Sequence, residues 1–229
     1  MTRRLPPRRR RAPSQSIVLW AAIGLVLTIC GTFVDAHVPS APWTWFDNGA
    51  FQPRVQSLGT QLQIAAVLLT GCVGGTRAGL MAQVAYVGLG LAGLPIFHGG
   101  GGLRYITAPS FGYLLGFIAG AGVCGRLVTR SLPRLPRFKP GTQGRSPRPY
   151  RPPYRAPYPS PHPSLERLAL SAGAGLASIH GLGLTWLLIF HGDRALNAAE
   201  QLTWSPLGGQ LILVCAVALL SCITRRLLF

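Results

Sequence analysis

The sequence predicts an all-α integral membrane protein in which six helices span the bilayer. Of its 229 residues, 48% are hydrophobic and only 12% are charged, against about 25% charged in typical soluble domains. The apolar residues also fall into separate runs. Each run approaches the roughly 20 helical residues that cross the hydrocarbon core and satisfy their own backbone hydrogen bonds. The six predicted spans are residues 17–33, 58–73, 79–97, 111–128, 165–190 and 206–224.

Two segments outside these spans have a different composition. Residues 1–16 hold six arginines, and residues 129–164 are dominated by proline, arginine and tyrosine. Such sequences lack the apolar side chains that a packed core requires. We therefore predict a disordered basic tail at 1–16, transmembrane helices one to four at 17–128, a disordered linker at 129–164 and transmembrane helices five and six at 165–229.

The basic residues indicate how the spans are oriented. The tail, Arg77, the stretch 126–167 and the pair Arg225 and Arg226 together hold 19 of the 22 lysines and arginines. With six spans these segments lie on one side, and the positive-inside rule makes that side cytoplasmic. We predict a multi-pass protein of the cell membrane with both termini in the cytoplasm. The net charge of +17 then favours contact with the lipid bilayer and not with nucleic acid.

The break between the third and fourth spans differs from a simple turn. Residues 98–107 contain four consecutive glycines followed by Arg104 and Tyr105. We interpret this segment as an ordered loop that folds back over a cavity and caps a ligand. The glycines at 112, 116 and 120 recur every four residues and predict close helix packing instead. Two polar residues inside spans, Gln83 and His180, are predicted to form hydrogen bonds between helices.

The sequence contains no recognisable catalytic or metal-binding pattern. Its five cysteines form no CxxC pair and lie within or beside apolar runs, so we predict reduced packing residues and no metal site. Paired carboxylates, GxSxG, HExxH and P-loop motifs are absent. The chain is therefore predicted not to be an enzyme and to carry no cofactor, and energised transport would need a partner that hydrolyses ATP.

Three segments resemble the BioY family. They are LQIAAVLLTGCVGG at 62–75, AYVGLGLAGLPIF at 85–97, and the glycine loop followed by APSFGYLLGF at 108–117. BioY proteins are the membrane-embedded substrate-binding subunits (S-components) of biotin transporters of the energy-coupling factor (ECF) type. The resemblance implies a six-helix S-component bundle around an outward-facing biotin pocket. It also implies biotin uptake with a coupling protein and ATPase subunits as partners.

The last span departs from the PGDxxK pattern that family members commonly carry. Gln210 stands where the family has aspartate, and Leu213 stands where it has lysine. A glutamine amide can still donate to and accept from the cyclic urea of biotin, whereas position 213 lacks the lysine charge. An S-component for another small vitamin and a non-transport structural or assembly membrane protein are therefore kept as alternatives.

The resemblance, together with the chemistry of biotin, defines a candidate site. Aromatic side chains would contact the apolar bicycle, amide and hydroxyl groups the urea, and one cation the carboxylate. The predicted aromatic contacts are Tyr86, Phe97, Tyr105 and Tyr113; the urea contacts are Gln63, Ser110 and Gln210; the carboxylate contact is Arg104; and Gly100 and Gly101 complete the set.

Overall fold

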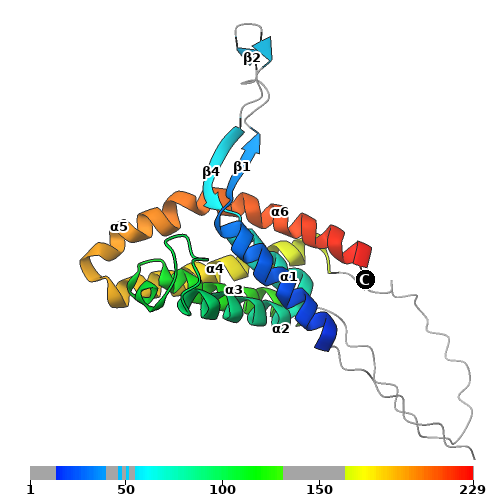
Figure 1. The fold of residues 1–229 in the computed structure, drawn as a ribbon. Helices are drawn as coiled ribbons and strands as arrows, with labels where there is room; N and C mark the ends of the chain where they lie inside the picture. Colours follow the sequence, from blue (N-terminus) through cyan, green and yellow to red (C-terminus); the bar gives the residue numbers. More distant parts are fainter. Residues whose placement is uncertain (1–13, 40–45, 48–49, 52–54, 131–162, 229) are drawn as a thin grey trace, which may run out of the picture.

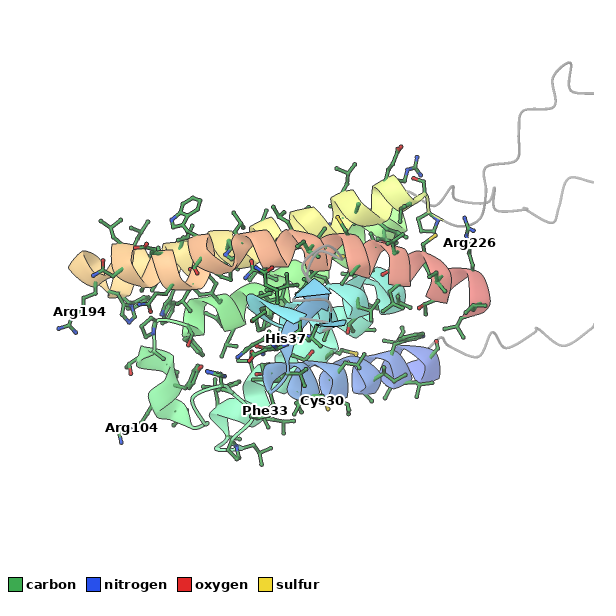
Figure 2. All side chains as sticks on the ribbon, turned by 90° about the horizontal axis from the view of Figure 1, so that it is seen from above. Cys30, Phe33, His37, Arg104, Arg194 and Arg226 are labelled. Carbon is green, nitrogen blue, oxygen red and sulfur yellow. The ribbon has the colours of Figure 1, made fainter. Side chains whose placement is uncertain are left out.

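The computed structural model describes residues 14–39, 46–47, 50–51, 55–130 and 163–228, and it is mostly helical. The predictions of disorder for residues 1–13 and 131–162 lie outside the described residues. Its α-helices are α1 (Ser14–Thr32), α2 (Gln63–Leu91), α3 (Phe111–Arg130), α4 (Leu165–Phe190), α5 (Ala195–Ala199) and α6 (Ser205–Leu228). The starts of α1 and α4 and the end of α6 lie at the same end of the bundle (Figures 1 and 2).

Four helical stretches are long and apolar enough to cross a membrane. They are Gln63–Leu91, Phe111–Thr129, Leu165–Phe190 and Ala195–Leu228, and Ser16–Thr32 is a shorter apolar helix. The predicted span at 165–190 matches α4 residue for residue. The first and fourth predicted spans agree with α1 and α3 to within a few residues at each end.

The helix α2 reverses direction at Gly75. This residue has φ 79° and ψ 179°, which are not helical values. The Gln63 side chain hydrogen-bonds Tyr86, 23 residues later, although a straight helix would separate these residues by about 34 Å. A Cβ on Gly79 would also lie 3.4 Å from the Gly71 Cα. The two segments of α2 therefore lie side by side, as the second and third predicted spans require.

The reversal leaves helix-end carbonyl groups without partners in their own segment. Arg225 in the last turn of α6 donates its Nε–H to the Cys72 carbonyl oxygen at 2.9 Å. The end of α6 thus stabilises the turn of α2 through a charge-assisted hydrogen bond.

The Cys72 and Cys124 sulfur atoms lie 2.9 Å apart in the interior, and the cysteines of the chain are free thiols.

The prediction of a purely α-helical chain was wrong between α1 and α2. Here β1 (Asp35–Pro39) pairs with β4 (Val55–Gln61) in an antiparallel hairpin, and β2 (Phe46–Asp47) pairs with β3 (Ala50–Phe51). The hairpin projects away from the helices (Figure 1). The predicted start of the second span at residue 58 was five residues too early, because the mixed polar sequence VQSLGTQ forms β4. The helix begins only at Gln63.

The predicted loop at 191–205 is instead helical. A 3₁₀ turn, η3 (Gly192–Arg194), leads into α5, and a π-helical segment, η4 (Glu200–Trp204), joins α5 to α6. Buried residues recur every four positions at Ala195, Ala199 and Thr203, so this polar-looking stretch has one face against the bundle. Its polar residues concealed that pattern in the sequence.

The third predicted span ends earlier than expected. Ala92 caps α2, and Gly93 follows with φ 109°, which glycine adopts readily. The predicted end at Phe97 was therefore six residues too late. The glycine loop contains a short bridge between Phe97 and Gly100 and then a 3₁₀ helix, η2 (Leu103–Thr107).

Glycines at four-residue spacing bring α3 and α4 together, as predicted. A Cβ on Gly116 would lie 2.6 Å from the Ile179 carbonyl oxygen, and one on Gly120 would lie 2.7 Å from Ile179 Cγ1. A Cβ on Gly112 would overlap Trp186. Backbones approach this closely only where the side chain is absent.

We expect Gly116→Ala to lower the free energy of unfolding by about 1–3 kcal/mol, because its methyl group would press on the backbone of α4. Gly173→Ala is the matched control, since a Cβ there has no atom within 4 Å and both changes gain similar helix propensity. Thermal unfolding in detergent would measure both. Equal thermal unfolding midpoints for the two variants would contradict the close packing of α3 against α4 at Gly116.

Candidate functional site

A cavity of about 580 Å³ lies between α2, α3, α4, α6 and the base of the β1–β4 hairpin. This volume is within the range of about 300–1,000 Å³ that small-molecule sites usually have. Its lining combines apolar and aromatic surface with mostly uncharged polar groups, and Asp35 is the one acidic residue among them. The lining residues are Asp35, Gly59, Thr60, Gln61, Gln63, Ile64, Tyr86, His98, Tyr105, Ser110, Tyr113, Leu114, Phe117, Ile179, His180, Gln201, Leu202, Pro206 and Gln210.

On one side of the cavity, the Tyr86 hydroxyl is the centre of a polar cluster. It accepts a hydrogen bond from Gln63 Nε2 at 2.7 Å and donates to the Ile96 carbonyl oxygen at 3.0 Å. Thr32 Oγ1 of α1 lies 3.1 Å from the same hydroxyl. These bonds fix the Gln63 amide. Its Oε1 has no hydrogen-bond partner among the described residues. Because Gln63 lines the cavity, this oxygen can accept a hydrogen bond from an N–H group of a ligand.

On the other side, a chain of hydrogen bonds crosses α3, η4, α4 and α6. Tyr113 Oη lies 2.6 Å from Thr203 Oγ1, which lies 3.2 Å from His180 Nδ1. His180 Nε2 lies 2.5 Å from Gln210 Oε1. Because Oε1 only accepts, His180 Nε2 carries the hydrogen and donates to it. The Gln210 amide N–H groups then point away from His180 and remain available at the cavity.

The glycine loop is anchored to the end of α2 beneath the cavity. Phe97 is buried, and its ring lies edge-on to Tyr86 with centroids 5.3 Å apart and 4.6 Å from the Tyr105 ring. The Gly102 N–H donates to the Gly90 carbonyl oxygen at 2.7 Å. Gly90 itself has no room for a Cβ beside the Phe97 ring. The loop therefore holds Tyr105 at the cavity through a packed aromatic stack.

A second hollow of about 450 Å³ lies on the outer side of the loop. Its lining includes Gly101 and Arg104, and it shares His98, Tyr105 and Ser110 with the main cavity. The exposed Arg104 side chain points away from the bundle (Figure 2).

The structure brings six of the ten predicted site residues to the main cavity. Phe97 and Gly100 form a backbone bridge with each other within the glycine loop. Gly101 and Arg104 line the outer hollow. The six that line the cavity are Gln63, Tyr86, Tyr105, Ser110, Tyr113 and Gln210.

Sequence reasoning missed several cavity residues. His180 was predicted to bond between helices, which is confirmed by its contact with Gln210, but it also lines the cavity. The Gln83 bond to Thr28 between α2 and α1 is likewise confirmed. Nothing in the sequence indicated that Asp35, Gln61 and the other hairpin residues would line the cavity, because their position depends on the pairing of β1 with β4. Among the described residues, no three metal-ligating side chains are grouped together.

A sequence profile of the BioY family matches residues 8–228. The chain belongs to the BioY family. It is 38% identical over 109 residues to a probable biotin transporter BioY of Lysinibacillus sphaericus, an alignment covering 48% of this chain and 47% of that protein. It is 43% identical over 111 residues to the biotin transporter BioY of Thermotoga maritima, covering 48% and 56% respectively. The chain thus spans about half the length of these curated BioY relatives.

A solved structure gives a more complete match to the fold of this BioY chain. The crystal structure of the S-component for biotin from an ECF-type ABC transporter aligns with a TM-score of 0.60 and covers 93% of this chain and 92% of that one. The sequence identity is 16%, so this likeness concerns the fold. The BioY chain therefore has the architecture of an S-component, while the roles of its individual residues rest on their own geometry.

Replacing Thr203 by valine should destabilise the protein by about 1–3 kcal/mol, because it leaves the Tyr113 hydroxyl and His180 Nδ1 without their shared partner. Thr185→Val is the matched control, since the exposed Thr185 hydroxyl bonds only the Gly181 carbonyl of its own helix. Thermal unfolding of both variants measures the difference. If the Thr203 variant were as stable as the control, the chain of hydrogen bonds would contribute nothing to the stability of the fold.

Proposed function

We propose that this protein is the biotin-binding subunit of an ECF-type transporter and captures biotin for uptake. The observation that carries the proposal is the cavity between Gln63 and Gln210 in a BioY-family fold. Two curated relatives bear the name biotin transporter, and the aligned solved structure is an S-component for biotin. A capture subunit needs a pre-formed site of this kind and no catalytic group.

The polar groups of the cavity are complementary to the urea of biotin. A cyclic urea has one carbonyl acceptor and two N–H donors. The Gln210 amide N–H groups can donate to that carbonyl, and Gln63 Oε1 can accept from a urea N–H, since neither group has a hydrogen-bond partner among the described residues. The rings of Tyr86, Tyr105 and Phe117 supply apolar surface for the bicycle and chain.

We further propose six spans with both termini in the cytoplasm. The reversal of α2 at Gly75 supports two spans in place of one long helix. The positions of charged residues support the orientation, because Arg104 and Arg194 lie at the end of the bundle opposite Arg226 (Figure 2). The cavity and the glycine loop then face outward, where biotin is captured.

The proposed partners are a membrane coupling protein and ATPase subunits. The 229 residues contain no P-loop, so uptake against a gradient would draw on ATP hydrolysis by another chain. Of the two changed positions in the last span, Gln210 lines the cavity. Leu213, at the position of the family lysine, is buried in α6 and does not line the cavity.

The purified full-length protein in lipid nanodiscs should bind radiolabelled biotin saturably. Unlabelled biotin should displace the label, whereas excess riboflavin or thiamine should not. Displacement by another vitamin would identify a different ligand for this S-component. Absence of binding to any vitamin by folded protein would favour the structural or assembly role.

Gln210→Leu should weaken biotin binding about 30-fold, or about 2 kcal/mol, because it removes the urea donor and leaves His180 Nε2 unpaired. Asn197→Ala is the control, since this exposed amide in α5 lies outside the cavity lining. Scintillation proximity measurements on both variants test the assignment. An unchanged dissociation constant for Gln210→Leu would remove this residue from the site.

A further inference from the structure

The backbone hydrogen-bond ladder of the helical stretch Ala195–Leu228 is interrupted beside the cavity. At the end of the π-helical segment η4, the Ser205 N–H donates to the Glu200 carbonyl oxygen, five residues earlier. In an α-helix the same N–H would donate to Gln201, four residues earlier. The next residue, Pro206, has no N–H group. The Gln201 carbonyl therefore receives neither the donor that an α-helix would supply nor the one that a π-helix would supply.

Pro206 explains why the helix is irregular at this point. In a regular α-helix its ring would clash with the carbonyl group of Leu202, four residues earlier. The wider π-helical turn inserts one extra residue and so avoids that arrangement, and such insertions often lie at functional sites. One proline thus accounts for both the irregular turn and the carbonyl group that lacks a helical donor.

The interruption lies at the cavity. Gln201, Leu202 and Pro206 all line it. Irregular backbone within a membrane-spanning helix is tolerated where it borders a cavity, because the released polar group can pair there with water or with a ligand. In many transporters, helix breaks near the binding site supply backbone groups to the transported species.

The interruption also lies close to Gln210. Thr203 of η4 has its Oγ1 atom 3.2 Å from His180 Nδ1, and Gln210 Oε1 lies 2.5 Å from His180 Nε2. A single imidazole ring therefore spans the gap between η4 and the Gln210 side chain. The urea of biotin is part of a five-membered ring of similar size. A ligand that contacts Gln210 can therefore also reach the backbone of η4.

The contacts proposed above leave one polar group of the urea without a partner. The Gln210 amide can donate to the urea carbonyl, and Gln63 Oε1 can accept from one N–H. We propose that the Gln201 backbone carbonyl accepts from the second N–H, so that the site recognises all three polar groups of a cyclic urea. The inference rests on the proposed function and adds a specificity-determining contact made by the main chain.

Substitutions of Pro206 test this contact, because they supply an N–H group that can complete the helix ladder. Pro206→Ala and Pro206→Val both add the N–H, and valine also keeps a side chain of similar volume at the cavity. Gly208→Ala is the matched control. It raises the helix propensity of α6 as well, its Cβ would have no atom within 4 Å, and it supplies no new donor to Gln201.

Titration calorimetry with the full chain in nanodiscs compares three ligands for each protein. They are biotin and the two cyclic carbamates in which one or the other urea N–H is replaced by an oxygen atom. Each carbamate keeps the shape of the bicycle and lacks one donor. The dependence of affinity on the ligand separates a lost hydrogen bond from a general distortion of the site.

We expect both Pro206 variants to bind biotin about five- to tenfold more weakly than the parent protein and Gly208→Ala. One carbamate should show the same loss. The other, which lacks the N–H that Gln201 accepts, should bind the variants at least as tightly as it binds the parent. Unchanged biotin affinity in both Pro206 variants, or an equal loss for all three ligands, would overturn the inference while the proposed function stands. Failure of the folded parent protein to bind biotin would overturn both proposals.

Discussion

Gln63 and Tyr86 meet at the cavity because α2 reverses direction at Gly75. The positive φ of this glycine ends one helical segment and starts the next without a longer loop, and Arg225 satisfies a carbonyl group at the break. The hydrogen bond from Gln63 to Tyr86 then joins the outer ends of the two segments. Phe97 packs against Tyr86 and carries the glycine loop. The site therefore depends on a turn at the opposite end of the bundle.

The polar residues of the bundle serve both stability and binding. In an apolar surrounding each donor or acceptor needs a partner, and the chain from Tyr113 to Gln210 and the cluster around Tyr86 provide partners across the helices. In each of these two networks one glutamine, Gln63 or Gln210, keeps an amide group that has no hydrogen-bond partner in the part of the chain that the structure describes. A ligand that completes these hydrogen bonds gains affinity without requiring the helices to move.

Much of the fold could be predicted from apolar runs, because their length and spacing decide which segments cross the bilayer. The family motifs led to Gln63, Tyr86, Tyr113 and Gln210, which the structure brings together. The hairpin could not be predicted because it depends on the pairing of β1 with β4. The helical segment after α4 could not be predicted because its buried face forms only against the rest of the bundle. Arg104 was assigned from its charge alone, and nothing in the sequence indicated which way its side chain points.

The claim that the cavity between Gln63 and Gln210 is the biotin site is tested most directly by a crystal structure of the protein with biotin bound. Anomalous scattering from the thioether sulfur would locate the bicycle independently of the surrounding density. The account predicts the sulfur peak inside the main cavity, with the urea between the two glutamine amides. A peak in the outer hollow beside Arg104, or elsewhere on the protein, would contradict it.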